Sequence, residues 1–181
     1  MSPFRPDLVE VWVFRDRSGA SSPASAEKAK SAPSDTSTLE ILMMRRSPGR
    51  ILPGLWQCVS GSLEMGESVA AGALRELREE TGFGALEILG FYDLDQVNQF
   101  HEPSVEAILS GAVFAVRVGP LAEAALSHEH DAGRWVSAQE ALRLAVWPAY
   151  RESIGRIVDN LLDSERAIWF ELTIEGARAR R

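Results

Sequence analysis

The order of predicted strands and helices indicates an α/β protein in which helices cover both faces of a mixed β-sheet. Strand-like segments precede one central helix, further strands follow it, and two more helices come late in the chain. The segment 107–118 is almost continuously apolar, which is typical of a strand buried on both faces. An α/β/α sandwich accounts for this order.

Each strand is predicted from alternation or from enrichment in β-branched and aromatic residues. We expect strands over 9–14, 39–44, 55–60, 86–92, 107–118 and 134–136. The polar segment 93–103 is expected to be irregular. After residue 167 the sequence alternates again, which leaves open an edge strand, an exchanged strand or a disordered tail.

The helices are predicted from capping residues and from positions that recur at helical spacing. The central helix is expected to begin after Ser68, which suits an N-cap, and to end at Gly82, which suits a left-handed C-cap. Ser137 and Glu140 form a capping box for the second helix, and Pro148 lies near the start of the last. One stripe of the central helix can face a core, and it consists of Ala70, Ala73, Leu74, Leu77 and Thr81.

Length and composition indicate one globular domain, because 181 residues suffice for one buried core and 45% of them are hydrophobic. We expect this domain to span 1–165 and to be followed by a tail, 166–181, that ends in the basic sequence GARARR. Between the first two strands, about 16–38 is rich in Ser, Ala, Lys, Pro and Gly, which favours a flexible insertion over a lid.

Charge and cysteine content argue against several classes of function. A net charge of −7 disfavours nucleic-acid and anionic-membrane partners, although a bound metal ion can still draw a polyphosphate to an acidic site. The single cysteine, Cys58, excludes an internal disulfide and a cysteine-based zinc site. Because no apolar run is signal-like or long enough to span a membrane, the sequence predicts a cytoplasmic protein. We expect it to be a monomer or a homodimer.

The central helix carries an acidic face formed by Glu76, Glu79 and Glu80. Residues three and four positions apart are neighbours on a helix, so these like charges are brought within a few ångströms of one another. Such a cluster contributes nothing to folding stability, but it suits a hard divalent cation such as Mg²⁺ beside a phosphate substrate. A glutamate pair alone is more often a solvated surface, and the surrounding pattern decides between the two interpretations.

The segment from Gly61 to Phe83, GSLEMGESVAAGALRELREETGF, resembles the full signature of the Nudix hydrolases. Every defining position is filled at the right spacing, and Phe83 stands where the family more often has an aliphatic residue. The resemblance covers about residues 7–163 and implies the Nudix fold, which is an α/β/α sandwich. The approach LWQCVSGSLEMGE and the later EH…RWV element are most similar to bacterial dihydroneopterin triphosphate or dATP pyrophosphohydrolases.

The resemblance implies roles for individual residues. The implied ligands for Mg²⁺, with Mn²⁺ as a possible substitute, are Glu76, Glu79, Glu80 and the backbone carbonyl of Gly61. Glu67 and Arg75 would form a structural salt bridge that holds the loop against the helix. For the general base, Glu129 matches a Glu-His element that often supplies a carboxylate near the metals, and Glu79 is the rival. His128 and His130 flank Glu129, but two histidines without a third ligand support zinc only weakly.

Substrate-binding residues must lie outside the signature. The planar guanidinium of arginine suits phosphate oxygens, so Arg45 or Arg46 could bind the distal phosphates. Asn98 and Gln99 could read the hydrogen-bonding edge of a base or pterin ring, and His101 could do the same or face water. An aromatic side chain could stack on that ring, and the candidates are Trp56, Phe100 and Trp147.

Three functions remain open from the sequence. The first is a Mg²⁺-dependent pyrophosphohydrolase that converts a nucleoside or pterin triphosphate to a monophosphate and pyrophosphate. The second is a hydrolase of dinucleoside polyphosphates, ADP-sugars or oxidised nucleotides. The third is a nucleotide sensor without turnover, which the complete set of acidic residues disfavours.

Overall fold

The structure, a computed structural model, describes residues 5–20 and 36–174. The expected flexible insertion therefore falls mostly outside the described residues, as does the basic end of the tail. Within the described part of the chain, no helix is long and apolar enough to cross a membrane.

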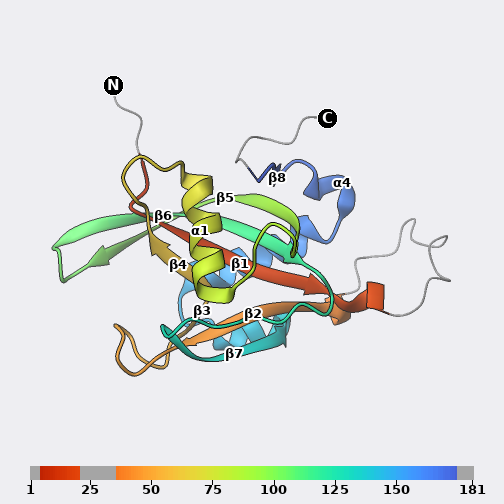
Figure 1. Cartoon of the computed structure of the whole chain (residues 1–181), viewed down its shortest axis with the longest axis horizontal. Coiled ribbons are helices and arrows are strands. Elements are labelled where there is room, and N and C mark those ends of the chain that lie inside the picture. The colour runs from red at the N-terminus through yellow and green to blue at the C-terminus, as the bar shows by residue number, and fades with distance from the viewer. Residues whose placement is uncertain (1–4, 21–35, 175–181) are drawn as a thin grey trace.

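The described residues form a mixed eight-stranded sheet with the order β3-β2-β1-β6-β5-β8, in which β4 also pairs with β1 and β7 with β2 (Figure 1). Strands β1 and β6 are parallel, and the other paired strands are antiparallel. The strands are β1 (Leu8–Asp16), β2 (Leu39–Arg46), β3 (Trp56–Gln57), β4 (Val59–Ser62), β5 (Ile88–Glu102), β6 (Ala107–Val118), β7 (His130–Ser137) and β8 (Glu171–Leu172).

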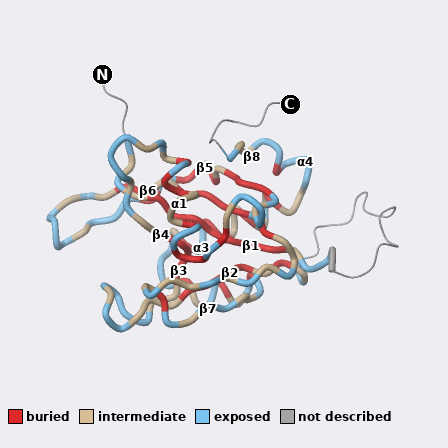
Figure 2. The backbone as a smooth tube through the Cα atoms, in the orientation of Figure 1, coloured by how far each residue is buried: buried red, intermediate tan, exposed pale blue. Residues whose placement is uncertain are grey.

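Helices pack on both faces of this sheet, and the predicted α/β/α arrangement is confirmed. On one face, Ala73 and Leu77 of α1 join the odd-numbered valines of β1 in a hydrophobic core. On the other face, Ile154 of α3 packs with the even-numbered Trp12 and Phe14 of β1. Figure 2 shows that the buried backbone follows the central strands between these layers. The helical segments are η1 (Arg17–Ala20), η2 (Thr36–Thr38), α1 (Val69–Thr81), α2 (Ala138–Leu144), α3 (Pro148–Arg156), η3 (Ile157–Leu161) and α4 (Ser164–Ala167).

The expectation that 93–103 is irregular is wrong, because β5 continues through this segment to Glu102. Its pairing with β6 shifts register between Asp93 and Val97, where Asp95 has a positive φ of 52°. Beyond this bulge the two strands form a hairpin that projects from the body of the molecule (Figure 1). Polar side chains are compatible with a strand there, since much of the hairpin faces solvent and need not alternate with a core.

Three other boundaries differ from expectation. The single strand predicted over 55–60 is two strands, because the chain pairs with β2 at Trp56–Gln57 and then with β1 from Val59. The strand predicted over 134–136 is longer, since all of β7 pairs with β2. In the tail, α4 is followed by β8, which pairs with β5 at Phe91 and Tyr92. The described part of the tail is therefore an edge strand packed on the sheet.

Candidate active site

The helix that carries the acidic face has the predicted ends. Ser68 is the N-cap of α1, and its hydroxyl accepts a hydrogen bond from Ala71 N at 3.1 Å. Gly82 lies just past the last turn in the left-handed region, with φ 75°, and its N–H donates to Arg78 O. These caps satisfy backbone groups that would otherwise lack partners, so the position of the acidic face along the helix is well defined.

Gly61 of β4 lies directly under the carboxylate of Glu76. A Cβ at position 61 would stand 1.9 Å from Glu76 Cδ and 2.1 and 2.2 Å from its two oxygens. Only a glycine therefore lets this carboxylate rest against the backbone of β4. Burial raises the pKa of Glu76, and the nearby charges of Glu79 and Glu129 add to that effect.

Arg75 fastens the loop between β4 and α1 to the helix. Its Nη2 lies 2.8 Å from Glu67 Oε1 and its Nε lies 3.2 Å from Glu67 Oε2, a two-point contact. Nη2 also donates to Ser62 O at 3.0 Å. Hydrogen bonds from Arg75 are the largest cause that lowers the pKa of Glu67 to about 2. Through Nη1, Arg75 also contacts Glu76 Oε1 at 2.7 Å and Glu79 Oε2 at 3.4 Å.

Glu80 is buried, with 4% of its surface exposed, although it carries a carboxylate. Its Oε1 accepts a long hydrogen bond of 3.3 Å from Ser60 N, and its Oε2 has no hydrogen-bond partner among the described residues. Burial is the main cause that raises the pKa of Glu80 to about 8, and the charges of Glu76 and Glu129 raise it further. A buried, unpaired carboxylate is costly to fold, so it indicates a functional role.

Glu129 enters the site from the segment that precedes β7. Ser127 N donates to Glu80 O at 3.1 Å, which docks this segment on the end of α1. The Glu129 carboxylate contacts Arg50 Nη2 at 3.0 Å, and the same nitrogen lies 2.6 Å from His128 Nε2. Arg50 therefore neutralises Glu129 from the loop between β2 and β3, and it is a site residue that the sequence analysis did not identify.

The donor set fits a hard divalent cation, because it consists of carboxylate and carbonyl oxygens with one buried oxygen unpaired. Among the described residues, however, no three His, Cys, Asp or Glu side chains converge on one point. Arg75 lies between Glu76 and Glu79, and the Glu79 side chain is 54% exposed. The histidines do not change this picture, since His128 contacts Arg50 and His130 faces Glu80.

The residues predicted to bind phosphate are differently placed. Arg45 makes a two-point contact with Asp131, at 2.7 and 3.1 Å, so its guanidinium already has a carboxylate partner. Arg46 donates a hydrogen bond from Nε to Ile51 O. Its positive charge acts on both Glu80 and His130. That charge lowers the pKa of Glu80, whereas burial raises it. Of the pair, Arg46 is therefore the one whose charge acts on the acidic cluster.

The residues predicted to recognise a ring are only partly available. The guanidinium groups of Arg45 and Arg134 lie 5.9 and 5.0 Å from the centre of the Trp56 ring. Asn98 is buried, donates to Glu10 Oε2 at 2.6 Å and accepts from Gln96, so its amide is engaged within the protein. The remaining candidates lie at least partly in solvent: Gln99, Phe100, His101 and Trp147.

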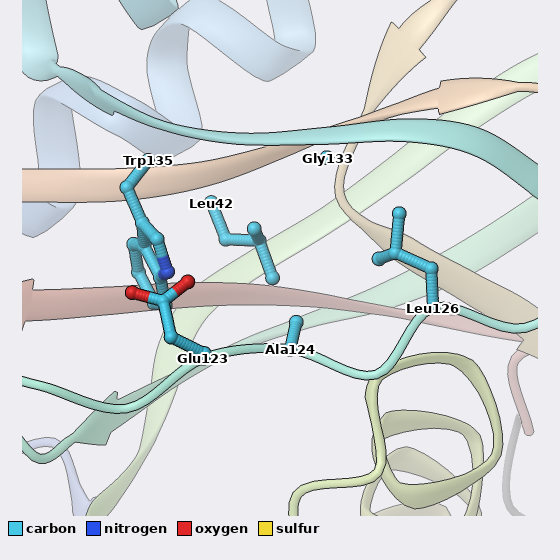
Figure 3. Close-up of a pocket in the computed structure, with 6 residues that line it drawn as sticks. All are labelled: Leu42, Glu123, Ala124, Leu126, Gly133 and Trp135. Atoms are coloured by element: carbon cyan, nitrogen blue, oxygen red, sulfur yellow. The ribbon is translucent and has the colours of Figure 1, made fainter.

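A cavity elsewhere in the molecule does not suit a nucleotide. Figure 3 shows it between β2, β7 and the segment that precedes β7, where Trp135 and Glu123 lie on one side. Its volume is about 60 Å³, whereas pockets for small molecules are of the order of 300–1,000 Å³. Arg15 stacks on Trp135 at 4.1 Å and contacts Glu123 at 3.1 Å, so these polar groups serve to hold the segment in place.

Comparison with known families identifies the class of protein. The family model described as NUDIX domain matches residues 33–157, which is more than half of the chain. The chain therefore belongs to the NUDIX family, as the segment from Gly61 to Phe83 predicted. Nudix hydrolases generally use divalent metal ions, in agreement with the oxygen donor set.

Two curated relatives are similar to parts of the chain. The mouse bis(5'-nucleosyl)-tetraphosphatase (asymmetrical) is 35% identical over 115 residues, which are 61% of this chain and 73% of the mouse protein. An octanoyltransferase of Myxococcus xanthus is 39% identical over 118 residues, which are 64% of this chain. The chain spans only about a third of the length of that octanoyltransferase, since the match covers 31% of it.

Solved structures show the same fold. A Caenorhabditis elegans Ap4A hydrolase aligns with a TM-score of 0.64 and 16% identity, over 86% of this chain and 96% of that one. The Escherichia coli dihydroneopterin triphosphate pyrophosphohydrolase aligns with a TM-score of 0.58 and 22% identity, over 83% and 97% of the two chains. At these identities the likeness concerns the fold and not the substrate.

Proposed function

We propose that this protein is a divalent-metal-dependent hydrolase that cleaves a phosphoanhydride bond of a nucleoside or pterin polyphosphate. The observation that carries the proposal is the buried Glu80 carboxylate, which has one unpaired oxygen and lies in electrostatic range of Glu76 and Glu129. These carboxylate oxygens suit a cation, and two arginines beside them suit the anionic substrate that a cation would bind, since the charge of Arg46 acts on Glu80 and Arg50 contacts Glu129.

In this proposal Glu76, Glu79, Glu80 and the Gly61 carbonyl hold the cation. When bound, Mg²⁺ or Mn²⁺ would neutralise charge on the phosphoryl oxygens and increase the acidity of a water molecule. The water oxygen attacks phosphorus, a P–O–P bridge bond breaks, and the departing phosphate keeps the bridging oxygen. Arg46 and Arg50 bind phosphate oxygens and orient the polyphosphate of the substrate for this displacement.

A carboxylate must accept the proton of the attacking water, and we assign this role to Glu129 with Glu79 as the alternative. The Glu129 carboxylate contacts Arg50 at 3.0 Å, and Arg50 can transfer to a substrate phosphate when the substrate binds. Glu79 contacts Arg75 at 3.4 Å from an exposed position. The two assignments differ in the effect of replacing Glu129, which should slow turnover without weakening metal binding only if Glu129 is the base.

For the substrate, a dinucleoside tetraphosphate cut asymmetrically is the first candidate. The support is the 35% identity to the mouse tetraphosphatase, which extends over 73% of that enzyme. Asymmetric cleavage would yield a nucleoside triphosphate and a nucleoside monophosphate. A nucleoside or pterin triphosphate is the second candidate, supported by the LWQCVSGSLEMGE and EH…RWV elements of the sequence.

The test is product release in the presence of Mg²⁺ from diadenosine tetraphosphate, the common dNTPs, dihydroneopterin triphosphate, 8-oxo-dGTP and ADP-ribose. We expect turnover that the Glu80→Gln variant loses, with ATP and AMP formed from the tetraphosphate. Pyrophosphate release confined to a triphosphate would select the second candidate. No mutant-sensitive turnover on any compound would refute the proposal. A Glu129→Gln variant with a lowered kcat and an unchanged Kd for Mn²⁺ would identify Glu129 as the base, and an unchanged kcat would transfer the role to Glu79.

A further inference from the structure

Two buried polar atoms face one another behind the acidic face of α1. His130 Nδ1 and Glu80 Oε2 are 3.7 Å apart, and their side chains are 0% and 5% exposed. Within the part of the chain that the structure describes, neither atom has a hydrogen-bond partner. Buried polar atoms in folded proteins are nearly always hydrogen-bonded, so an unpaired nitrogen and an unpaired oxygen that face each other require an explanation.

The contact with Gln57 indicates which nitrogen of the imidazole carries the proton. The side-chain Nε2 of Gln57 lies 3.4 Å from His130 Nε2, and an amide nitrogen can only donate. In a neutral imidazole one nitrogen donates and the other accepts. If His130 Nε2 accepts from Gln57, the proton resides on Nδ1, which is the nitrogen that faces Glu80.

The backbone holds His130 and Glu80 in a defined relationship. His130 is the first residue of β7, where it pairs with Arg46 of β2. Its N–H donates to Ser127 O at 3.2 Å, and Ser127 N donates to Glu80 O at 3.1 Å. One short segment thus connects the imidazole to the end of α1, so a small movement can close the gap between the two side chains.

We propose that His130 is a positioning residue that donates a hydrogen bond from Nδ1 to Glu80 Oε2 and so orients this carboxylate towards a divalent cation. The proposal rests on the proposed function in that Glu80 is taken as a metal ligand. Ser60 N already donates to Oε1 at 3.3 Å, so a donor at Oε2 would hold the carboxylate from both sides. Contraction from 3.7 Å to about 2.8 Å completes the hydrogen bond.

Two substitutions separate this role from simple filling of space. Counted in bonds from Cβ, the asparagine side-chain nitrogen is as far out as histidine Nδ1, and the glutamine nitrogen is as far out as Nε2. His130→Asn therefore keeps a donor towards Glu80, while His130→Gln moves it towards Gln57. Both residues are neutral amides at the same buried position, so each is the control for the other.

The measurement is the Kd for Mn²⁺ of the full chain, from the electron paramagnetic resonance signal of free Mn²⁺, without substrate. We expect His130→Asn to bind within about threefold of the natural protein, and His130→Gln to bind about 10–100-fold more weakly. Equal Kd values for the two variants would overturn the proposal, whether both equal that of the natural protein or both are raised. Melting in EDTA shows whether both variants are folded.

A spectroscopic measurement on the natural protein needs no variant to fold. ¹⁵N spectra of its three histidines distinguish the two neutral tautomers. We expect one buried histidine in the Nδ1–H form, with shifts that move when Mg²⁺ is added, and the Nε2–H form would contradict the proposal. If the His130 pattern holds but the natural protein hydrolyses nothing, the proposed function fails alone. If hydrolysis occurs and both amide variants bind Mn²⁺ equally, the inference fails alone.

Discussion

At the scale of single residues, the acidic site depends on the absence of a side chain as much as on its carboxylates. Glu76 rests on Gly61, and Arg75 joins the loop to the helix through Glu67. Glu80 keeps an unpaired oxygen in a buried position. Each of these arrangements is local and depends on a few ångströms, so single substitutions should affect function far more than folding.

Gly61→Ala should abolish most turnover. Its Cβ would stand within 2.2 Å of the Glu76 carboxylate, so that the side chain must leave its position on β4. We expect kcat/KM to fall by about a hundredfold or more, because misplacement by about 1 Å can cost that much. Gly49→Ala is the matched control, since nothing lies within 4 Å of a Cβ there. Equal activity of the two variants would show that Glu76 does not need its place beside Gly61.

At the scale of elements, the caps of α1 decide where the acidic face lies and how the following segment docks. Gly82 reverses the chain at the end of the helix, and Ala125 N donates to the neighbouring Thr81 O at 2.8 Å. The same docking continues to Glu129, so the helix end and the candidate base belong to one structural unit.

Gly82→Ala should destabilise the protein by about 1–2 kcal/mol, the usual cost of a left-handed conformation for a residue with a Cβ. Gly82 has φ 75°, and an added Cβ would lie 3.2 Å from Ala125 Cβ. Gly155→Ala in α3 is the control of opposite sign, because its Cβ meets nothing within 4 Å and alanine favours helix by about 0.5–1 kcal/mol. Urea unfolding measures both changes, and an equal effect of the two substitutions would contradict the capping argument.

At the scale of the whole molecule, a chain of buried polar groups links the sheet to α3. Ser153 donates to Gln96 Oε1 at 3.1 Å, Gln96 donates to Asn98 Oδ1 at 2.8 Å, and Asn98 donates to Glu10 Oε2 at 2.6 Å. Among the described residues, no arginine or lysine forms an ion pair with Glu10. The fold thus buries the carboxyl group of Glu10 in surroundings that favour its protonated form.

Stability without metal should fall as the pH rises from about 4.5 to about 7. Burial raises the pKa of Glu10 to about 7 from 4.5, and the Asn98 hydrogen bond only partly opposes this. The folded state therefore holds a proton that the unfolded chain has released, so raising the pH across this window favours unfolding. A pKa that moves from 4.5 to about 7 corresponds to about 3 kcal/mol of unfolding free energy.

Glu10→Gln tests this assignment, because glutamine can still accept from Asn98 without ionising. Urea unfolding in EDTA at several pH values should show that the unfolding free energy of the variant depends less on pH than that of the natural protein. At pH 8 we expect the variant to be the more stable of the two. The same slope in both proteins would show that other groups cause the effect. Glu152→Gln, at an exposed position of α3, controls for loss of one charge.

The class of fold, the ends of the central helix and the family could all be predicted from the amino-acid sequence. These features depend on local rules, namely hydrophobic periodicity, capping residues and a signature in which nearly every position is occupied. Ser68, Gly82 and Pro148 act on neighbouring backbone, so their roles can be read without knowing what lies opposite.

Contacts between residues that are distant in the chain could not be predicted and are known from the folded molecule. Arg50 on Glu129, His130 behind Glu80 and Asn98 on Glu10 all join residues far apart in the chain. The split of the strand over 55–60 likewise follows from a change of pairing partner, and the polar strand over 93–102 from a hairpin that projects into solvent. These groups are placed by pairing between strands that are distant in the sequence. The sequence of one strand does not indicate which other strand it pairs with.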